Sequence, residues 1–275
     1  MRNQEHNKTI INLISSKKIP EWIQYLIGVI VLSLILCLSL APDKLKPSGK
    51  MRLIIETIRN GSIEAKSKAI WKLQKNDPSE SASAVFLLID IIGDETTASR
   101  EISEEYHRTQ ENLAAPFADL HEEKEITIGD LAVWSIRRIR QNLVIECVGD
   151  GGPTGKLAAV RKAINENLLP KLCSFNESVK RRVLKVLLGD SDPTPIETVL
   201  SCGLSDSSPN IRALSAGLFI TYACTDKGRA KIAVPKLIEL LDDPDESVSL
   251  IAHKALALTT GYDMGSSSTS WKEKN

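Results

Sequence analysis

One glycine-rich stretch in the middle of the chain has residue types that bind phosphate. Residues 143–148 are mostly apolar and precede Gly149-Asp-Gly-Gly-Pro-Thr-Gly-Lys156, as a strand precedes a phosphate loop. Such a loop needs a glycine at its first position and a serine or threonine after its lysine to hold magnesium. Asp150 and Leu157 occupy those two positions. The stretch therefore predicts a turn and no nucleotide site.

His121-Glu122 places an imidazole beside a carboxylate, and both are ligand types that a transition metal accepts. The other histidines, His6, His107 and His253, are followed by Asn, Arg and Lys. Several such pairs would have to converge on one metal, so this single pair predicts a surface histidine. No spacing singles out a Ser/His/Asp or Cys/His set either. We therefore expect a protein that is no enzyme and that has no catalytic residue, metal or cofactor site.

The five cysteines show no pattern of a metal site or of a disulfide framework. Cys37 lies in an apolar run, and the others are scattered without a Cys-x-x-Cys pair. Their spacing predicts small buried hydrophobic residues in helix packing. The four outside the apolar run are Cys147, Cys173, Cys202 and Cys224.

The elements that would carry these residues are helices. Four stretches share a central apolar residue, here called the pivot, with apolar residues seven and eleven positions before it and four and eight after it. Only Ser215 breaks the rule. Spacings of four and eight lie on one helix face and the seven-residue gap leaves room for a turn, so each stretch predicts an antiparallel helix pair. The pivots are Ala65, Val179, Ile211 and Val248.

The last three pivots are 32 and 37 residues apart, a period typical of stacked helical repeats. We predict a repeat domain over 51–265, interrupted by an insertion at 94–124. The insertion holds nine acidic and three basic residues and few aromatics, which predicts an exposed loop or a loosely packed helix that proteases cut first. Residues 42–50 form a linker, and residues 266–275 a carboxyl-terminal tail.

A membrane anchor is predicted before the repeats. No charge interrupts residues 22–41, and twenty residues at about 1.5 Å each span a hydrocarbon core of about 30 Å. Trp22 and Tyr25 suit the interface. A signal peptide cleaved after Ala41 is the alternative, but the apolar run exceeds the usual length. We favour a single-pass membrane protein, with residues 1–21 as an amino-terminal flank.

The side of the membrane is left open by the charges beside the anchor. Arg2, Lys8, Lys17 and Lys18 precede it, and Lys44, Lys46, Lys50 and Arg52 follow it. The positive-inside count is therefore four on each side. Of the two orientations we favour the one that places the repeats outside the cytoplasm.

The composition agrees with an all-α protein and gives no overall charge that would attract a partner such as nucleic acid. The formal net charge is zero, so no nucleic-acid partner is expected. Aromatic residues make up 4% and apolar residues 42% of the chain. That balance suits helices packed through Leu, Ile, Val and Ala better than it suits sheets.

The last repeat carries a family resemblance. Residues 241–248, Leu-Asp-Asp-Pro-Asp-Glu-Ser-Val, followed by Ala252 and Leu256, resemble the HEAT-repeat pattern, and Thr260 to Gly265 with Trp271 resemble the close of bacterial HEAT-like proteins. Independently, Gly261 suits a left-handed helix terminator that returns Trp271 over the end of the stack. The resemblance covers the chain from about Met51 onward. It implies a right-handed α-solenoid of about five helix pairs after one transmembrane helix.

HEAT-like solenoids imply a protein-binding scaffold, with the second helix of each pair on the binding side. Some repeat proteins of this kind are hydroxylases or bilin lyases that use a metal or a pigment, and such an enzyme is the alternative. Basic residues follow the pivots at Lys66, Lys180 and Arg212, and acidic residues favour the turns; pairing of Arg212 with Asp206 within one repeat would make these faces merely solvated. The candidate partner-binding ridge, suited to an acidic protein, consists of Arg137, Arg138, Arg181 and Lys185.

Overall fold

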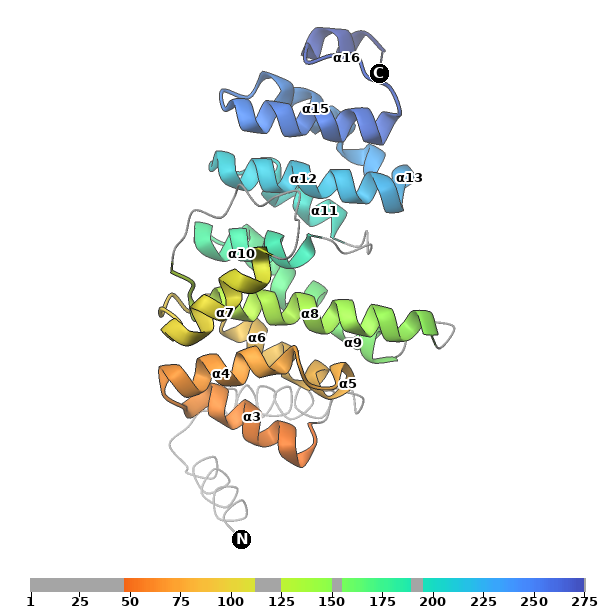
Figure 1. Cartoon of the computed structure of the whole chain (residues 1–275). Coiled ribbons are helices and arrows are strands. Elements are labelled where there is room, and N and C mark those ends of the chain that lie inside the picture. The colour runs from red at the N-terminus through yellow and green to blue at the C-terminus, as the bar shows by residue number, and fades with distance from the viewer. Residues whose placement is uncertain (1–46, 112–124, 150–154, 189–194, 275) are drawn as a thin grey trace, which may run out of the picture. The chain divides into compact units, whose positions relative to one another are not determined.

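The computed structural model of this protein describes residues 47–111, 125–149, 155–188 and 195–274. The described residues are all-α, and their strand-like pairing is limited to an isolated bridge between Thr97 and Thr127 (Figure 1). The chain divides into Met1–Lys46 and Pro47–Asn275. The predicted flank 1–21, anchor 22–41 and most of the linker lie outside the described residues. Among the helices that are described, none is long and apolar enough to cross a membrane.

The first helices begin at serine caps. Ser48 accepts a hydrogen bond from the backbone N–H of Met51, and Ser62 accepts one from Ala65, so orphan amides at both helix starts are satisfied. Pro78 opens the next element at the first helical turn, where its missing N–H costs nothing. The elements up to residue 149 are α3 (Gly49–Asn60), α4 (Ile63–Leu73), α5 (Pro78–Ser81), η2 (Ala82–Ala84), α6 (Val85–Asp90), α7 (Arg100–Glu111) and α8 (Ile128–Gly149).

The later part of the chain alternates segmented helices with regular ones. Asn176 and Asp245 cap two of the regular helices through their side chains. The elements are α9 (Gly155–Ala163), η4 (Ile164–Leu168), η5 (Leu169–Cys173), α10 (Glu177–Leu187), α11 (Ile196–Thr198), η6 (Val199–Gly203), α12 (Pro209–Thr225), α13 (Lys227–Ala230), η7 (Lys231–Ala233), α14 (Val234–Glu239), η8 (Leu240–Asp242), α15 (Glu246–Thr260) and α16 (Ser268–Lys274).

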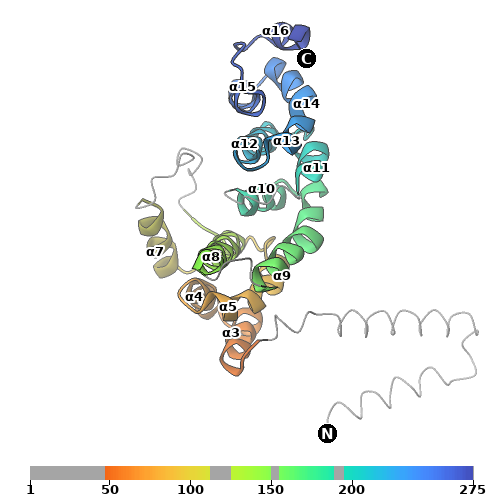
Figure 2. The same cartoon turned by 90° about the vertical axis from the view of Figure 1, so that its right-hand side faces the viewer.

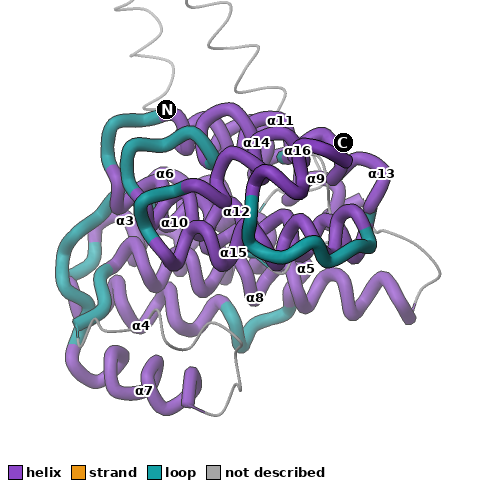
Figure 3. Tube along the Cα trace, turned by 90° about the horizontal axis from the view of Figure 1, so that it is seen from above, coloured by secondary structure: helices purple, strands orange, loops and turns teal. Residues whose placement is uncertain are grey.

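Within Pro47–Asn275 these helices stack in two layers (Figures 2 and 3). The second-helix layer contains α4, α8, α10, α12 and α15, and each of these helices contacts the next. The first-helix layer contains α3, α5 with α6, α9 with η5, α11 with η6, and α13 with α14. Each helix thus buries one face against its pair and its edges against neighbouring pairs. Helix α7 lies outside both layers, beside α4 and α8 (Figure 2).

The core follows the predicted apolar spacing. Ile211 and Val248 are fully buried, whereas the pivots Ala65 and Val179 are half-buried. The exception Ser215 has a steric reason, because η6 passes so close that a Cβ at Gly203 would lie 2.9 Å from the Cβ of Ser215. A larger apolar side chain at position 215 would not fit there.

The carboxyl-terminal end closes the stack as the sequence predicts. Gly261 adopts φ 86° and ends α15 in the left-handed conformation that favours glycine. Trp271 is fully buried, and its indole N–H donates to the carbonyl of Gly265 at 2.7 Å. Its helix, α16, packs on α14. Helix α16 occupies residues 268–274 of the predicted tail 266–275.

One prediction about the cysteines is wrong. Cys173 and Cys202 are not isolated buried hydrophobic residues but form a disulfide, with their Cα atoms 5.2 Å apart. It joins η5 to η6, the first-layer segments of two consecutive helix pairs. The bond was not predicted because 29 residues separate the two cysteines, and only the packing of one pair on the next brings them together.

Candidate functional site

Helix α7 is held on the second-helix layer by an aromatic cluster. Tyr106 meets Trp71 of α4 and Trp134 of α8 edge-on, with ring centroids 6.3 and 5.6 Å apart. The two tryptophans stack on each other at 6.4 Å. Trp134 also donates its indole N–H to the side-chain oxygen of Gln74 at 2.8 Å. Edge-on and stacked rings of this kind add stability beyond the area they bury.

One face of α7 packs on the second-helix layer. Ile102 is buried four residues before Tyr106, so the two share one helix face. Ion pairs from α4 and from the turn after it flank that face, Lys68 with Glu101 at 2.6 Å and Lys75 with Glu105 at 2.8 Å, but their exposure makes them weak. Helix α7 therefore packs through one face only, with Ile102 as its one buried residue among those described, and residues 112–124 of the insertion lie outside the described residues. Two apolar residues at the right spacing outweigh the acidic composition.

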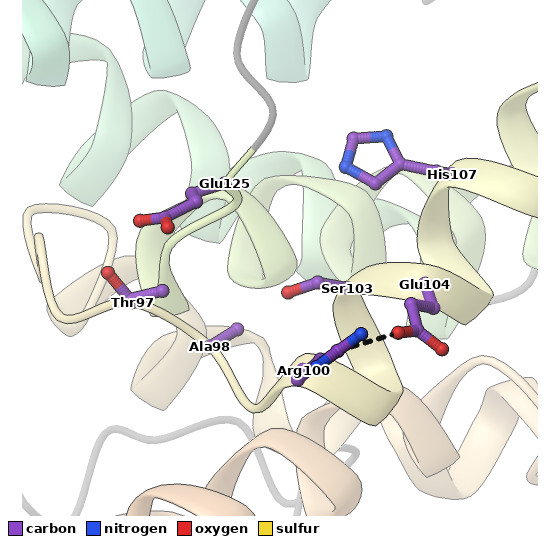
Figure 4. A pocket seen from close by; sticks show the side chains of 7 residues that line it. All are labelled: Thr97, Ala98, Arg100, Ser103, Glu104, His107 and Glu125. Carbon is purple, nitrogen blue, oxygen red and sulfur yellow. Dashed lines mark hydrogen bonds and ion pairs between the residues drawn. The ribbon is translucent and has the colours of Figure 1, made fainter.

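A pocket of about 350 Å³ lies beside α7 (Figure 4). His107, Ser103 and Glu104 face it from the helix, and Glu125 faces it from the other side. Glu104 is already paired with Arg100 at 2.9 Å. Residues 112–124, which follow α7 in the chain, lie outside the described residues, and we assign no reaction to this pocket. The pocket is lined by Thr97, Ala98, Arg100, Ser103, Glu104, His107 and Glu125.

The most deeply buried charge is Arg182, which the sequence analysis did not single out. Only 1% of its side chain is exposed. Its guanidinium donates to both carboxylate oxygens of Glu95 at 2.8 and 3.0 Å, and to Asp130 at 3.1 Å. It also donates to the hydroxyl of Thr127 and to the carbonyl of Ile92. These hydrogen bonds connect α10 to the first turn of α8 and to the loop before it.

The electrostatics of this Arg182 cluster favour the charged forms of both partners. Burial works against the charge on Arg182 and would lower its pKa, but the bonds to Glu95 and Asp130 outweigh burial and raise that pKa. Burial likewise opposes the charge on Asp130, but Arg182 and Thr127 outweigh it and lower the pKa of this carboxyl. Gly129 is required beside the cluster, because a Cβ there would meet Arg182 Nη1 at 2.8 Å. The one sign of this cluster in the sequence is that Arg182 is a charged residue on the apolar face of its helix.

Ion pairs between consecutive helix pairs use the residue just after the pivot. In each, a basic side chain on one second helix reaches an aspartate that follows the first helix of the next pair. Each aspartate also accepts a backbone N–H two residues further on. The pairs are Lys66–Asp94 at 3.7 Å, Lys180–Asp206 at 2.6 Å and Arg212–Asp243 at 2.7 Å. These basic residues are structural links along the stack.

The expected pairing of Arg212 with Asp206 inside one repeat is therefore wrong. Arg212 donates through Nε and Nη2 to both carboxylate oxygens of Asp243, at 2.7 and 2.8 Å. Its hydrogen bond to Asp206 goes to the backbone carbonyl, to which Nη1 donates at 2.8 Å. This bidentate contact lowers the pKa of Asp243 and raises that of Arg212. Arg212 and Asp243 lie far apart in the sequence, so their pairing becomes visible only when the two repeats are stacked.

The predicted ridge residues fall into two groups. Arg137 is half-buried beside Tyr106, and burial lowers the pKa of its guanidinium, which the nearby tyrosine partly offsets. Arg138 lies over the ring of Trp134 at 5.8 Å and donates to Gln141. These two belong to the region of the α7 contact. Arg181 and Lys185, on α10, are half-buried and lie beyond the aromatic cluster in the next pair.

The other chemical motifs are only partly within reach of the structure. Gly149 ends α8 and Gly155 begins α9, while 150–154 of the phosphate-loop-like stretch lie outside the described residues. His121-Glu122 also lies outside them. His253 pairs with Asp263 at 2.8 Å. Among the residues that are described, no group of three or more His, Cys, Asp or Glu side chains could hold a metal ion.

Comparisons with known proteins add little to this geometry. No family model matches the chain, and no curated protein matches it. Among solved structures, the crystal structure of an engineered protein is similar over 78% of this chain and 98% of its own length, with 14% identity and a TM-score of 0.39. At that TM-score the similarity supports no conclusion about fold or function.

Proposed function

We propose that this protein is a membrane-anchored, HEAT-like α-solenoid that acts as a scaffold for a protein partner. The layered helix pairs, the recurring pivots and the links between successive pairs support the solenoid. The uninterrupted apolar run at 22–41 supports the anchor. The described geometry and the charge pattern support a binding surface on the second-helix layer.

The observation that carries the proposal is the packing of α7 on the second-helix layer. Trp71, six residues after its pivot, is one of the rings that hold α7 on the layer. The same register places Lys185 on α10, Gly217 on α12 and Lys254 on α15. No described helix covers this side of α10, α12 and α15 (Figure 2). The layer thus binds one helix at its first two pairs and presents equivalent positions on α10 and α15, where Lys185 is half-buried and Lys254 is exposed, whereas Gly217 on α12 is buried.

The side chains at those later positions indicate the partner's chemistry. Positions two, six and ten after the pivot of α15 are Leu250, Lys254 and Leu258, and the two leucines are 51% and 46% exposed. They form one stripe, because residues four apart share a helix face. On α10 the first two of these positions are Arg181 and Lys185. An aliphatic stripe beside basic groups suits an amphipathic helix that carries acidic residues.

The test compares two matched charge reversals in the full-length protein. Proximity labelling of the wild type in its native cells identifies neighbours, whose capture is then measured for each variant. We expect Arg181→Glu with Lys185→Glu to lower capture at least tenfold and to weaken its salt dependence. The control, Arg52→Glu with Lys231→Glu, changes the net charge equally at exposed sites of the first-helix layer. Equal capture by both variants would reject the surface.

The second candidate function is a repeat-containing hydroxylase or bilin lyase. His121-Glu122 and the resemblance motivate it. Metal analysis and an absorbance spectrum of the purified protein distinguish it from a scaffold, because either enzyme would bring a stoichiometric metal or a pigment band.

A further inference from the structure

We propose that the Cys173–Cys202 disulfide is a covalent link between repeats that forms in an oxidising compartment, so that residues 47–274 lie on the extracytoplasmic side of the membrane. The bond itself does not depend on the proposed anchor. The assignment of the repeats to one side of the membrane does depend on the anchor, because a secreted protein that has lost its signal peptide would form the same bond.

The two cysteines are brought together by packing that the rest of the stack already requires. Segment η5 contacts both η6 and α11 in the first-helix layer. The second helices of the same two pairs, α10 and α12, contact each other and are linked by Lys180 and Asp206 at 2.6 Å. The disulfide on one layer and the ion pair on the other therefore hold the same junction from both sides.

This junction also has a chemical route to oxidation. Cys173 is exposed and Cys202 is half-buried, so an oxidant can reach the first sulfur. The thiolate of Cys173 attacks the disulfide of a dithiol–disulfide oxidoreductase, and a mixed disulfide forms. The thiolate of Cys202 then displaces the oxidoreductase. The two cysteines lose their S–H protons and two electrons, and the oxidant's disulfide takes up both protons and both electrons to become two thiols.

The compartment follows from the persistence of such bonds. Glutathione and thioredoxin systems keep most cytosolic thiols reduced, whereas disulfides persist in secreted and extracytoplasmic proteins. The positive charges beside the predicted anchor are balanced at four on each side and leave the orientation open. An exposed disulfide between two repeats favours the orientation with the repeats outside the cytoplasm.

Cys224 supplies an internal control. It is an exposed free thiol on α12, outside the disulfide. Trypsin separates the three cysteines into peptides 172–180, 186–212 and 213–227. The full-length protein in its native cells is alkylated at lysis, digested without reduction and examined by mass spectrometry. We expect peptides 172–180 and 186–212 as one cross-linked species, and 213–227 alkylated. Alkylation of all three cysteines would overturn the disulfide.

A second arm tests the side of the membrane. A maleimide that cannot cross membranes is added to intact cells, and a permeant maleimide is added to a parallel sample. We expect Cys224 to react with both reagents. Reaction with the permeant reagent alone would place the repeats inside the cytoplasm and reject the proposed orientation. Recovery of the protein outside the membrane fraction with the cross-link intact would instead reject the anchor and leave the disulfide standing.

A third arm measures what the bond contributes to the fold. Closing a loop of this length constrains the unfolded chain, so Cys173→Ser with Cys202→Ser should lower Tm by about 5–10 °C. Cys224→Ser should leave Tm within about 2 °C of the wild type. Equal Tm values for all three proteins under oxidising conditions would show that the bond does not hold the junction.

Discussion

At the scale of single residues, the charges whose removal should matter most are those that are buried and paired. Arg182 is the clearest case, because a guanidinium with 1% exposure would be very costly without the oxygen atoms that surround it. Its neighbour Arg181 is half-buried and lies toward the surface. Two adjacent arginines therefore have different roles, and only their side-chain environments distinguish them.

The first prediction compares these two arginines. Arg182→Met leaves Asp130 and Glu95 without their cation, and we expect the free energy of unfolding to fall by about 3–5 kcal/mol. The matched control Arg181→Met should cost about 1 kcal/mol or less. Urea denaturation followed by far-UV circular dichroism measures both. Equal losses would show that the Arg182 cluster has no special weight.

The second prediction concerns pH. The folded state lowers the pKa of Asp130 below its unfolded value of about 3.9, so this carboxylate stabilises the fold above that value. Its contribution is lost as pH falls through the folded pKa. Between about pH 5 and pH 2, the stability of Asp130→Asn should therefore decline less steeply than that of the wild type. The slope is reduced and not abolished, because Asp94 and Asp243 also have lowered pKa values. Parallel curves would contradict the assignment.

At the scale of elements, each helix pair is joined to the next by a charge pair at a fixed place. The residue after the pivot pairs forward with an aspartate in the following turn, as Arg212 does with Asp243. Between α8 and α10 the direction reverses, and Arg182 on the later helix reaches back to Asp130. Arg182 also bonds Glu95, at the start of the insertion that separates α6 from α8, and Thr127, just after it, so this link holds the two ends of the insertion as well.

The third prediction tests one such link by a double-mutant cycle. We expect Arg212→Ala and Asp243→Ala to show a coupling energy of about 1–3 kcal/mol, because the contact is bidentate and both side chains are at most 14% exposed. The pair Arg229 with Glu197 is the control, since its side chains are 44% and 62% exposed. Its coupling should stay below about 1 kcal/mol. Equal coupling in the two cycles would show that burial adds nothing to the link.

At the scale of the whole molecule, the described residues behave as one continuous stack in which each pair relies on its neighbours. Such stacks are capped at their ends, and Trp271 on α16 closes the carboxyl-terminal end here. The unit Pro47–Asn275 is compact by itself, and the buried apolar residues of the described part lie between positions 51 and 271.

The fourth prediction follows from that separation. Residues 47–275 expressed alone should be mainly helical by circular dichroism and should unfold cooperatively. The full-length chain should instead stay in the membrane fraction after carbonate washing, because the apolar run at 22–41 is held by hydrophobic transfer and not by charge. A mature amino terminus at Pro42 would establish a cleaved signal peptide in place of the anchor.

The sequence by itself determined the helical class, the pivots and the carboxyl-terminal cap, because these depend on local periodicity and on one left-handed glycine. It failed for Arg182, for the partner of Arg212, for the packing of α7 and for the Cys173–Cys202 disulfide. Each of these is a contact between segments that lie far apart in the chain. Spacing along one helix shows which face is buried but not what it is buried against, and only the stacking of one pair on the next decides that.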